Sequence, residues 1–147
     1  MKYKEETGDL FLVPSDYCLV QTISADLAMG TGIAYEFNKR YQLKRALFKK
    51  YGERTYKWDE SDKPGECLKM GNVFSLVIKR GYTQKATYPD IRTALHQLKV
   101  QTQQYSIKKI AMPKFGCDKD GLKWQQISDM IKAEFMDTDM EILIRTL

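Results

Sequence analysis

The chain has 147 residues and a formal net charge of +5, with 43% hydrophobic and 29% charged residues. These values exclude a disordered or fibrous chain, and the length is typical of one domain, which we expect to span residues 1–147. No apolar run approaches the roughly 20 residues that span a bilayer, and the first residues lack the apolar segment of a secretory signal, so we expect an intracellular protein with no membrane partner.

The first third of the chain predicts two strands followed by a helix. Residues 3–6 and 17–23 have the composition of strands, and the second has the β-branched and apolar content of a buried one. The next apolar residues recur at every fourth position, which predicts a helix over residues 33–41 with one apolar face. That face consists of Ile33, Phe37 and Tyr41.

The middle of the chain predicts a second helical piece, a loop and a hairpin. Helical spacing continues over residues 43–48, whereas residues 52–64 are polar and punctuated, which predicts a surface loop or a short extension. Residues 65–70 and 73–79 predict two strands. The Gly-Asn pair between them tolerates positive φ, so we expect a tight turn there.

The last third predicts helices over residues 88–105 and 122–135, which alternate with strands over residues 108–112 and 141–147. Pro89 fits the first turn of its helix, because the missing N–H has no partner there. Strands that alternate with helices predict a three-layer α/β/α domain with a central mixed, largely parallel sheet.

Cysteine and histidine usage gives no sign of a metal centre. Cys18, Cys67 and Cys117 are widely spaced and form no C-x-x-C pair, so we expect neither a disulfide framework nor a zinc site, and we predict no metal and no cofactor. Cys18 and Cys67 fall in predicted strands, where we expect them to be buried. His96 lies on a different helical face from the apolar residues of its helix, so we expect it to be solvated rather than a catalytic base.

Positive charge is concentrated in one part of the chain. Such a cluster permits a nucleic acid or another polyanion as a partner. The other interpretation is that these side chains form the solvated faces of helices, and both interpretations stay open. The residues are Lys39, Arg40, Lys44, Arg45, Lys49, Lys50, Arg54 and Lys57.

Two glycine-containing loops, residues 24–34 and 112–122, each follow an apolar run and precede an amphipathic one. Glycine lets the backbone approach a ligand closely, and a helix start offers free N–H groups, so each loop suits a phosphate. Ligands of open α/β sheets bind outside the carboxyl ends of the strands, where both loops are expected. Two such loops on one sheet predict a diphosphate site.

Polar side chains at the same strand ends are the candidates for chemistry. Lys79 is either a solvated surface group or, when unprotonated, a nucleophile. Asp120 is either the N-cap of the following helix or a proton relay that faces this amine. Asp9 either closes a turn or accepts a hydrogen bond from the exocyclic amine of a base. The remaining candidates are Ser24, Asp26, Asp118 and Lys119.

Six separated motifs, in order along nearly the whole chain, resemble the macrodomain family, and in particular its minimal branch of the terminal ADP-ribose protein glycohydrolase type. The agreement of several motifs makes the resemblance specific, whereas any one of them alone is weak. The motifs are Gly8-Asp9-Leu10-Phe11, Ile23-Ser24-Ala25-Asp26, Met29-Gly30-Thr31-Gly32-Ile33-Ala34, Lys85-Ala86-Thr87-Tyr88, Met112-Pro113-Lys114-Phe115-Gly116-Cys117 and Asp120-Gly121-Leu122-Lys123-Trp124.

The resemblance implies a cleft for ADP-ribose. In that cleft Asp9 holds the adenine amino group, Leu10 supports the ring, and Ser24 contacts the first loop or the ligand. The first loop surrounds the distal ribose and a phosphate, and the second offers N–H groups to the diphosphate. The remaining implied binding residues are Met29, Gly30, Thr31, Gly32, Ile33, Pro113, Phe115, Gly116, Cys117, Asp118 and Leu147.

The resemblance also implies an enzyme, because Lys79 and Asp120 match the catalytic lysine and aspartate of that branch. Lys79 attacks the distal ribose and expels a carboxylate, and Asp120 assists and resolves the adduct. The implied activity is removal of ADP-ribose from protein acidic side chains, O-acetyl-ADP-ribose or nucleic-acid bases. Two departures from the family are the Asp118-Lys119 pair, where a glycine and an apolar residue are expected, and the length of residues 52–64.

Two other functions use the same cleft. A non-catalytic module would bind ADP-ribose and recruit the modified partner. A phosphatase would hydrolyse ADP-ribose 1″-phosphate. No heptad repeat or large apolar stripe favours a dimer, so we expect a monomer whose partners are ADP-ribose or an ADP-ribosylated protein, with an ADP-ribosylated nucleic acid as a further candidate.

Overall fold

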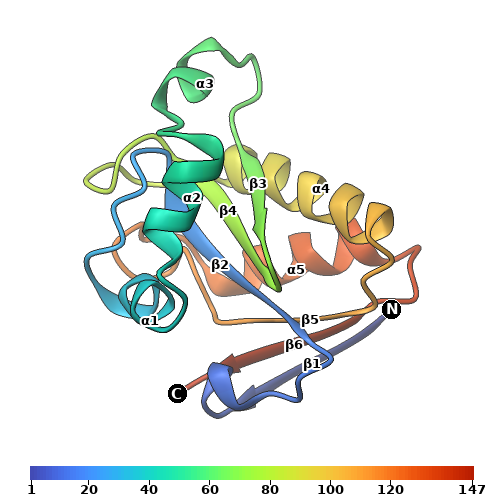
Figure 1. The fold of residues 1–147 in the computed structure, drawn as a ribbon. Helices are drawn as coiled ribbons and strands as arrows, with labels where there is room; N and C mark the ends of the chain where they lie inside the picture. The colour runs from blue at the N-terminus through green and yellow to red at the C-terminus, as the bar shows by residue number, and fades with distance from the viewer.

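The computed structural model of the protein describes residues 1–147 and contains one six-stranded sheet in the order β1-β6-β5-β2-β4-β3 (Figure 1). β3 pairs antiparallel with β4, and every other pair is parallel, which confirms the predicted mixed, largely parallel sheet. The carboxyl ends of the parallel strands therefore meet at one edge. The strands are β1 (Lys2–Thr7), β2 (Cys18–Ser24), β3 (Glu66–Met70), β4 (Val73–Lys79), β5 (Lys109–Met112) and β6 (Glu141–Thr146).

Helices cover both faces of the sheet, which confirms the predicted three layers. α1 and α2 pack on one face, and α4 and α5 pack on the other (Figure 1). None of the helices has the length and apolarity that crossing a membrane requires. The helices are the 3₁₀ turn η1 (Leu10–Leu12), α1 (Gly32–Tyr41), α2 (Leu43–Tyr51), α3 (Thr55–Glu60), α4 (Tyr88–Gln104) and α5 (Trp124–Phe135).

Alternating side chains of the strands feed two separate cores. In β2, Cys18 and Val20 face the core under α4 and α5, whereas Leu19 and Ile23 face the core under α1 and α2. Successive strand residues point to opposite faces, so β2, which has apolar side chains toward both cores, is buried on both sides. Cys18 and Cys67 are both buried, as predicted.

The predicted apolar face of residues 33–41 is only partly correct. Phe37 is fully buried and packs edge to face against Phe11, with ring centroids 4.9 Å apart. Ile33 and Tyr41 at the two ends of the helix are exposed. Gln42 adopts φ 49° and ψ 42°, a left-handed conformation that ends α1 before α2 begins. A helix this short touches the sheet over its middle turn, so its ends remain in solvent.

Residues 52–64, predicted as a loop or short extension, contain the helix α3. Its N-cap residue, Arg54, makes no capping hydrogen bond, so local sequence gives little sign of the helix. Tertiary contacts hold the segment instead. Arg54 forms a bidentate ion pair with Glu66 at 2.9 and 2.8 Å, and Arg80 pairs with Asp59 at 2.8 Å. Trp58 packs against the core under α1 and α2.

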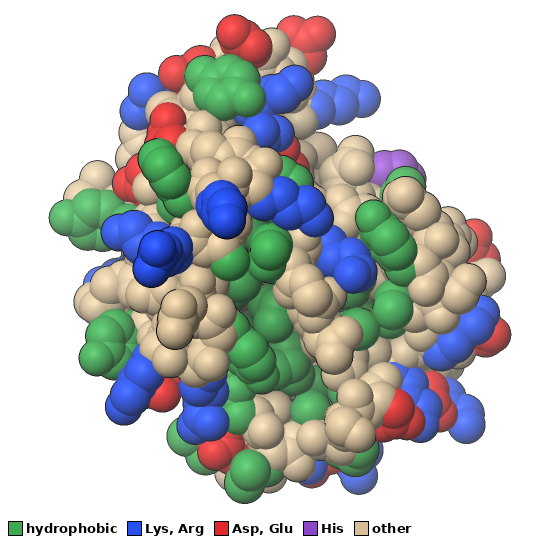
Figure 2. Space-filling model, in the orientation of Figure 1, with side chains coloured by type: hydrophobic (Ala, Val, Ile, Leu, Met, Phe, Trp, Pro, Cys, Tyr) green, Lys and Arg blue, Asp and Glu red, His purple; other side chains and the backbone are tan.

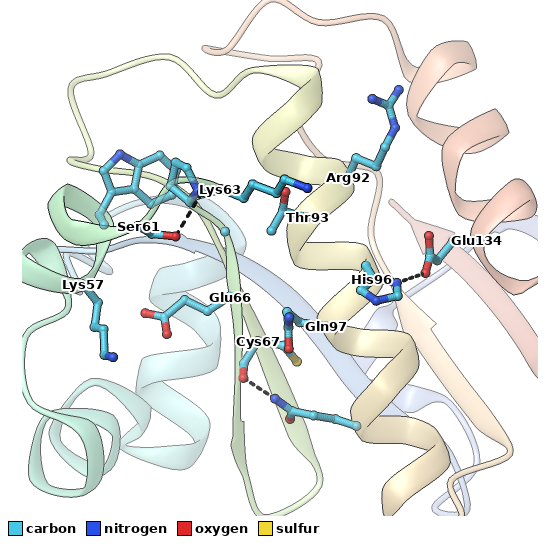
Figure 3. Close-up of a pocket in the computed structure, with 14 residues that line it drawn as sticks. Lys57, Ser61, Lys63, Glu66, Cys67, Arg92, Thr93, His96, Gln97 and Glu134 are labelled. Carbon is cyan, nitrogen blue, oxygen red and sulfur yellow. Dashed lines mark hydrogen bonds and ion pairs between the residues drawn. The ribbon is translucent and has the colours of Figure 1, made fainter.

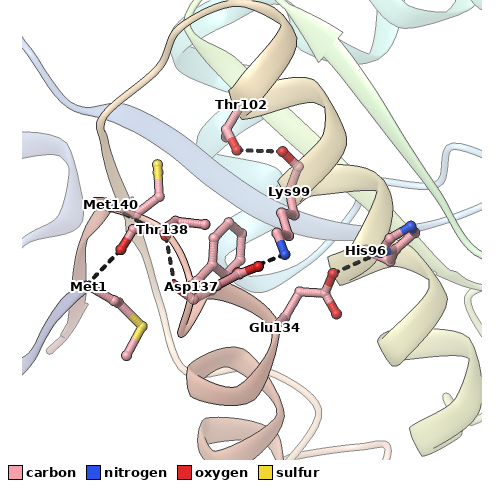
Figure 4. A network of polar contacts seen from close by, with 9 residues as sticks. Met1, His96, Lys99, Thr102, Glu134, Asp137, Thr138 and Met140 are labelled. Atoms are coloured by element: carbon pink, nitrogen blue, oxygen red, sulfur yellow. Dashed lines mark hydrogen bonds and ion pairs between the residues drawn. The ribbon is translucent and has the colours of Figure 1, made fainter.

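Polar contacts join the middle of α4 to the C-terminal end of α5 and the residues after it (Figure 4). His96 Nδ1 lies 2.8 Å from Glu134 Oε1, and Lys99 Nζ donates to Asp137 Oδ1 at the same distance. The His96 side chain is exposed, which confirms that it does not lie on the apolar face of α4.

Candidate active site

The ion pair between Lys79 and Asp120 is the chemical centre of the candidate site. Lys79 ends β4, and Asp120 lies in the loop between β5 and α5. Lys79 Nζ donates to Asp120 Oδ1 at 3.1 Å, and the two side chains are only 15% and 11% exposed. The backbone N–H of Ala86 donates to the same carboxylate oxygen at 2.9 Å. A shielded amine beside a held carboxylate can serve as a nucleophile with a proton acceptor.

This arrangement excludes one of the two alternatives that the sequence left open for each residue. Lys79 is not a solvated surface group. Asp120 does not cap the following helix, because Lys123 occupies the N-cap position of α5 and Asp120 bonds to Lys79 and Ala86. Arg80, beside Lys79 in the chain, pairs outward with Asp59.

A cleft of about 350 Å³ opens over this pair. Its walls come from the end of β2, the first loop with the start of α1, the end of β4, and the second loop. The neighbouring strands β2, β4 and β5 bring these segments together although they are far apart in the chain. The lining residues are Thr22, Ile23, Ser24, Ala28, Gly30, Thr31, Ala34, Ile78, Lys79, Tyr82, Lys119 and Asp120.

Asp26 organises the first loop. Its Oδ1 accepts hydrogen bonds from the Ser24 hydroxyl and from the Ala28 N–H, and its Oδ2 accepts from the Tyr82 N–H at 3.2 Å. Burial raises the pKa of Asp26, but the hydrogen bonds from Ser24 and from the backbone N–H groups outweigh it, so the pKa lies below its ordinary value. Ser24 contacts the first loop, which is one of the two roles expected of it.

The first loop leads into a helix start that no side chain caps. Thr31 is the N-cap of α1 and its hydroxyl makes no capping hydrogen bond, so the first N–H groups of the helix are free for a ligand. Gly32 has φ +60°, a conformation that other residues rarely adopt. Met29 is buried beneath the loop, whereas Ile33 is exposed at its rim.

The second loop is shaped by Gly116, which has φ +77°. Its carbonyl accepts from the Leu122 N–H at 2.8 Å, which closes the loop. Phe115 is buried against Trp124, with ring centroids 5.9 Å apart. Cys117 and Asp118 are exposed and Pro113 is buried.

Asp9 and Leu10 lie at the β1 end of the same edge of the sheet. The Gly8 N–H donates to the Thr146 carbonyl at 3.1 Å, which places this turn beside the end of β6. Asp9 Oδ1 accepts from the Phe11 N–H at 2.9 Å, so the carboxylate closes a turn, one of its two expected roles. Leu10 is buried, and Leu147 is 93% exposed.

No family model matches the chain. ADP-ribose glycohydrolase OARD1 of Bos taurus is 31% identical to it over 144 residues, which cover 95% of this chain and 88% of the relative. The solved macrodomain of Mycobacterium tuberculosis DarG aligns with a TM-score of 0.79 at 20% identity, over 99% of this chain and 97% of that one.

The chain belongs to the macrodomain family. Within the family it is of the ADP-ribose glycohydrolase OARD1 type. The fold also matches Thermosipho africanus DarTG, solved in complex with ADP-ribose, with a TM-score of 0.71 at 16% identity, over 99% of this chain and 42% of that one. The predicted family and fold class are therefore confirmed.

This macrodomain brings some of the predicted site residues together and leaves others apart. Six of them line the cleft: Ser24, Gly30, Thr31, Lys79, Lys119 and Asp120. The others lie outside its lining. Buried Met29, Leu10 and Phe115 support the loops from beneath, and the exposed residues of the second loop lie nearer the solvent. No three His, Cys, Asp or Glu side chains converge as metal ligands would.

Sequence reasoning gave no role to Ala86 or Tyr82. The Ala86 N–H holds Asp120, and the Tyr82 N–H holds Asp26, so the segment after β4 supports both loops of the macrodomain. The motif at residues 85–88 was visible in the sequence. Its role could not be predicted, because every residue except proline has a backbone N–H and the residue type does not show which one is used.

Proposed function

We propose that this macrodomain is an ADP-ribosyl hydrolase that releases ADP-ribose from ester linkages to acidic side chains of proteins and from O-acetyl-ADP-ribose. The Lys79–Asp120 pair is the observation that carries the proposal, because a module that only binds ADP-ribose needs neither group. Its OARD1-type relatives, which are named ADP-ribose glycohydrolases, support the same reaction class.

ADP-ribose would lie along the carboxyl edge of the sheet. Asp9 takes the adenine amino group with its second carboxylate oxygen, since Oδ1 is bonded to Phe11. The uncapped start of α1 and the loop at residues 116–118 offer N–H groups to the diphosphate. The distal ribose then enters the cleft above Lys79. The solved complex of Thermosipho africanus DarTG with ADP-ribose supports a ligand of this class on this fold.

The reaction begins with transfer of a proton from Lys79 to Asp120, which frees the nitrogen lone pair. Lys79 Nζ attacks C1″ of the distal ribose, and the C1″–O bond breaks so that the carboxylate leaves with the bonding electrons. The proton on Asp120 passes to solvent, and the Asp120 carboxylate then takes a proton from a water molecule that replaces the nitrogen at C1″. That proton returns from Asp120 to the released amine of Lys79, which restores the ion pair.

Release of ADP-ribose from a glutamate-linked ADP-ribosylated protein tests this proposal. We expect the wild type to release it and Lys79→Ala to lose the activity while calorimetry shows that ADP-ribose still binds. Mass spectrometry of the wild type should show an adduct on Lys79. Lys4→Ala, an exposed lysine on β1, is the matched control. Unchanged turnover in Lys79→Ala would disprove the assigned mechanism, and binding without any turnover would favour a reader module.

A carrier made of nucleic acid is the second candidate, and one surface favours it. Lys and Arg side chains gather over α1, α2 and α3 (Figure 2). Tyr41 and Phe48 on this surface are 47% and 61% exposed, so aromatic rings lie among the charges. Cations interleaved with exposed aromatic rings suit single-stranded nucleic acid, because the phosphates pair with the cations and the bases stack on the rings.

We also propose that residues 1–147 act as one intracellular domain and as a monomer. One sheet that includes strands from both ends of the chain supports the single domain. Free cysteines at positions 18, 67 and 117 support a reducing compartment. Light scattering after size-exclusion chromatography should give a mass close to 17.1 kDa, and twice that value would show a dimer.

A further inference from the structure

A second hollow, of about 670 Å³, lies between α4 and the segment that runs from α3 into β3 (Figure 3). It shares no lining residue with the cleft above Lys79. Polar and charged side chains form nearly all of its wall. In Figure 3, Lys63 reaches across from the loop toward Thr93 of α4, with Glu66, Cys67 and Gln97 below them.

The hollow carries uncompensated positive charge. Lys57, Lys63 and Arg92 line it, and none of them forms an ion pair. Its two carboxylates are engaged by other groups, because Glu66 bonds to Arg54 and Glu134 bonds to His96. Three unpaired cations from separate elements line this one hollow, and their summed charge favours an anionic ligand.

The remaining groups favour a peptide over a nucleic acid. The side chain of Gln97 makes no hydrogen bond, and that of Gln101 uses only its Nε2, which donates to the Cys67 carbonyl of the edge strand β3 at 2.6 Å. Free amide groups match the hydrogen bonding of a peptide backbone. The two rings of the lining are engaged by other groups, because Trp58 packs in part against the core and the His96 ring is bonded to Glu134. The hollow therefore offers less stacking surface to single-stranded nucleic acid than the surface that carries Tyr41 and Phe48.

The hollow lies close to the catalytic end of β4. Glu66 at its wall pairs with Val77, two residues before Lys79 in the neighbouring strand. Arg80, directly after Lys79, is tied to Asp59 of α3 at 2.8 and 3.2 Å. An extended chain advances about 3.3 Å per residue, so a carrier with its modified side chain at Lys79 reaches the hollow within a few residues.

We propose that this hollow binds an acidic segment of the ADP-ribosylated protein, next to the modified side chain. Lys57, Lys63 and Arg92 pair with its carboxylates, and Gln97 bonds to its backbone. The inference rests on the proposed function, because it assigns the hollow to the carrier of the ester-linked ADP-ribose. It names the chemistry of the preferred carrier, which the cleft above Lys79 leaves undetermined.

Binding of an unmodified, fluorescein-labelled peptide with several Glu and Asp residues tests the hollow without any hydrolysis. We expect the Kd to rise about tenfold in Lys63→Glu/Arg92→Glu and less in Lys63→Gln/Arg92→Gln, and to rise with ionic strength in the wild type. Lys108→Glu, which reverses an exposed charge away from the hollow, should leave the Kd unchanged. Lys63 and Arg92 are both exposed, and a thermal melt checks that each variant is folded.

Equal peptide affinity in the wild type and the charge-reversal variant would overturn the inference. So would a larger loss of affinity for a single-stranded oligonucleotide than for the peptide, which would assign the hollow to nucleic acid. In hydrolysis assays, the variant should raise KM for a peptide substrate with acidic flanks about tenfold, with kcat and turnover of O-acetyl-ADP-ribose unchanged. Absence of turnover in the wild type would reject the proposed function, while the binding result would still decide whether the hollow takes an acidic peptide.

Discussion

Lys79 Nζ lies 3.1 Å from Asp120 Oδ1, a hydrogen bond between side chains that are 41 residues apart in the chain. The Ala86 N–H bonds to the same oxygen, which fixes the carboxylate against the end of β4. The second carboxylate oxygen makes no hydrogen bond and can face a ligand in the cleft. An amine held against a carboxylate in this way has its proton acceptor in place before the substrate binds.

Asp120→Asn tests the proton transfer. The amide oxygen can still accept from Lys79 and Ala86, but the side chain can no longer take a proton. We expect kcat to fall by a factor of about 10²–10⁴, and a thermal melt checks that the variant is folded. Steady-state hydrolysis of an ester-linked substrate measures this, and Asp62→Asn at an exposed loop position is the control. A variant that keeps more than half of the wild-type kcat would remove Asp120 from the mechanism.

Gly116→Ala tests the geometry of the second loop. The residue has φ +77°, and a Cβ there would lie 2.7 Å from Ile127 Cδ1, so both strain and overlap oppose the substitution. We expect a loss of about 2 kcal/mol or more in the free energy of unfolding, measured by chemical denaturation. Gly30→Ala has no heavy atom within 4 Å and no positive φ, and should cost clearly less. Equal losses of unfolding free energy in the two variants would show that the loop relieves the overlap between the new Cβ and Ile127.

Asp26 should make stability depend on pH. Its pKa lies below the ordinary 3.8, because the hydrogen bonds outweigh burial, so the folded state favours the charged form. The charged Asp26 therefore adds to the free energy of unfolding. This stabilisation is complete above the pKa of the unfolded state and is lost as the pH falls through the lower pKa of the folded state. At about pH 7 we expect Asp26→Asn to melt at a lower temperature than the wild type. This difference in melting temperature should shrink below about pH 3.8. A difference that stays constant across that range would contradict the assignment.

The basic surface over α1 and α2 should contribute to the binding of nucleic-acid carriers and not to the binding of other carriers. Lys44→Glu/Lys49→Glu removes two exposed cations that make no ion pair. If each contacts one phosphate of a single strand, the slope of log K against log salt flattens by about 1.4. Titration of an oligonucleotide at several salt concentrations measures it. An unchanged slope and unchanged affinity would mean that these cations are only a solvated helix face.

The sequence by itself determined the features that depend on neighbouring residues. The β-branched and apolar content of β2 indicated a buried strand, and the helical spacing through Leu95 and Leu98 indicated a helix packed on the sheet, because the period of the backbone fixes the direction of each side chain. The loops after β2 and β5 could be recognised for a similar reason. Gly32 and Gly116 in these loops have positive φ. Because glycine is the residue that adopts positive φ most readily, its presence in the sequence indicates such a turn.

Only the tertiary structure decided where the candidate residues lie and which groups they contact. Residue type could not separate a solvated Lys79 from a shielded one, or an N-capping Asp120 from one bonded to Ala86. The helix α3 likewise depends on Arg54 finding Glu66 across 12 residues and on the packing of Trp58. These outcomes follow from strand order, which brings the ends of β2, β4 and β5 together. Burial and hydrogen bonding between distant segments are properties of that arrangement, and no local stretch of sequence encodes them.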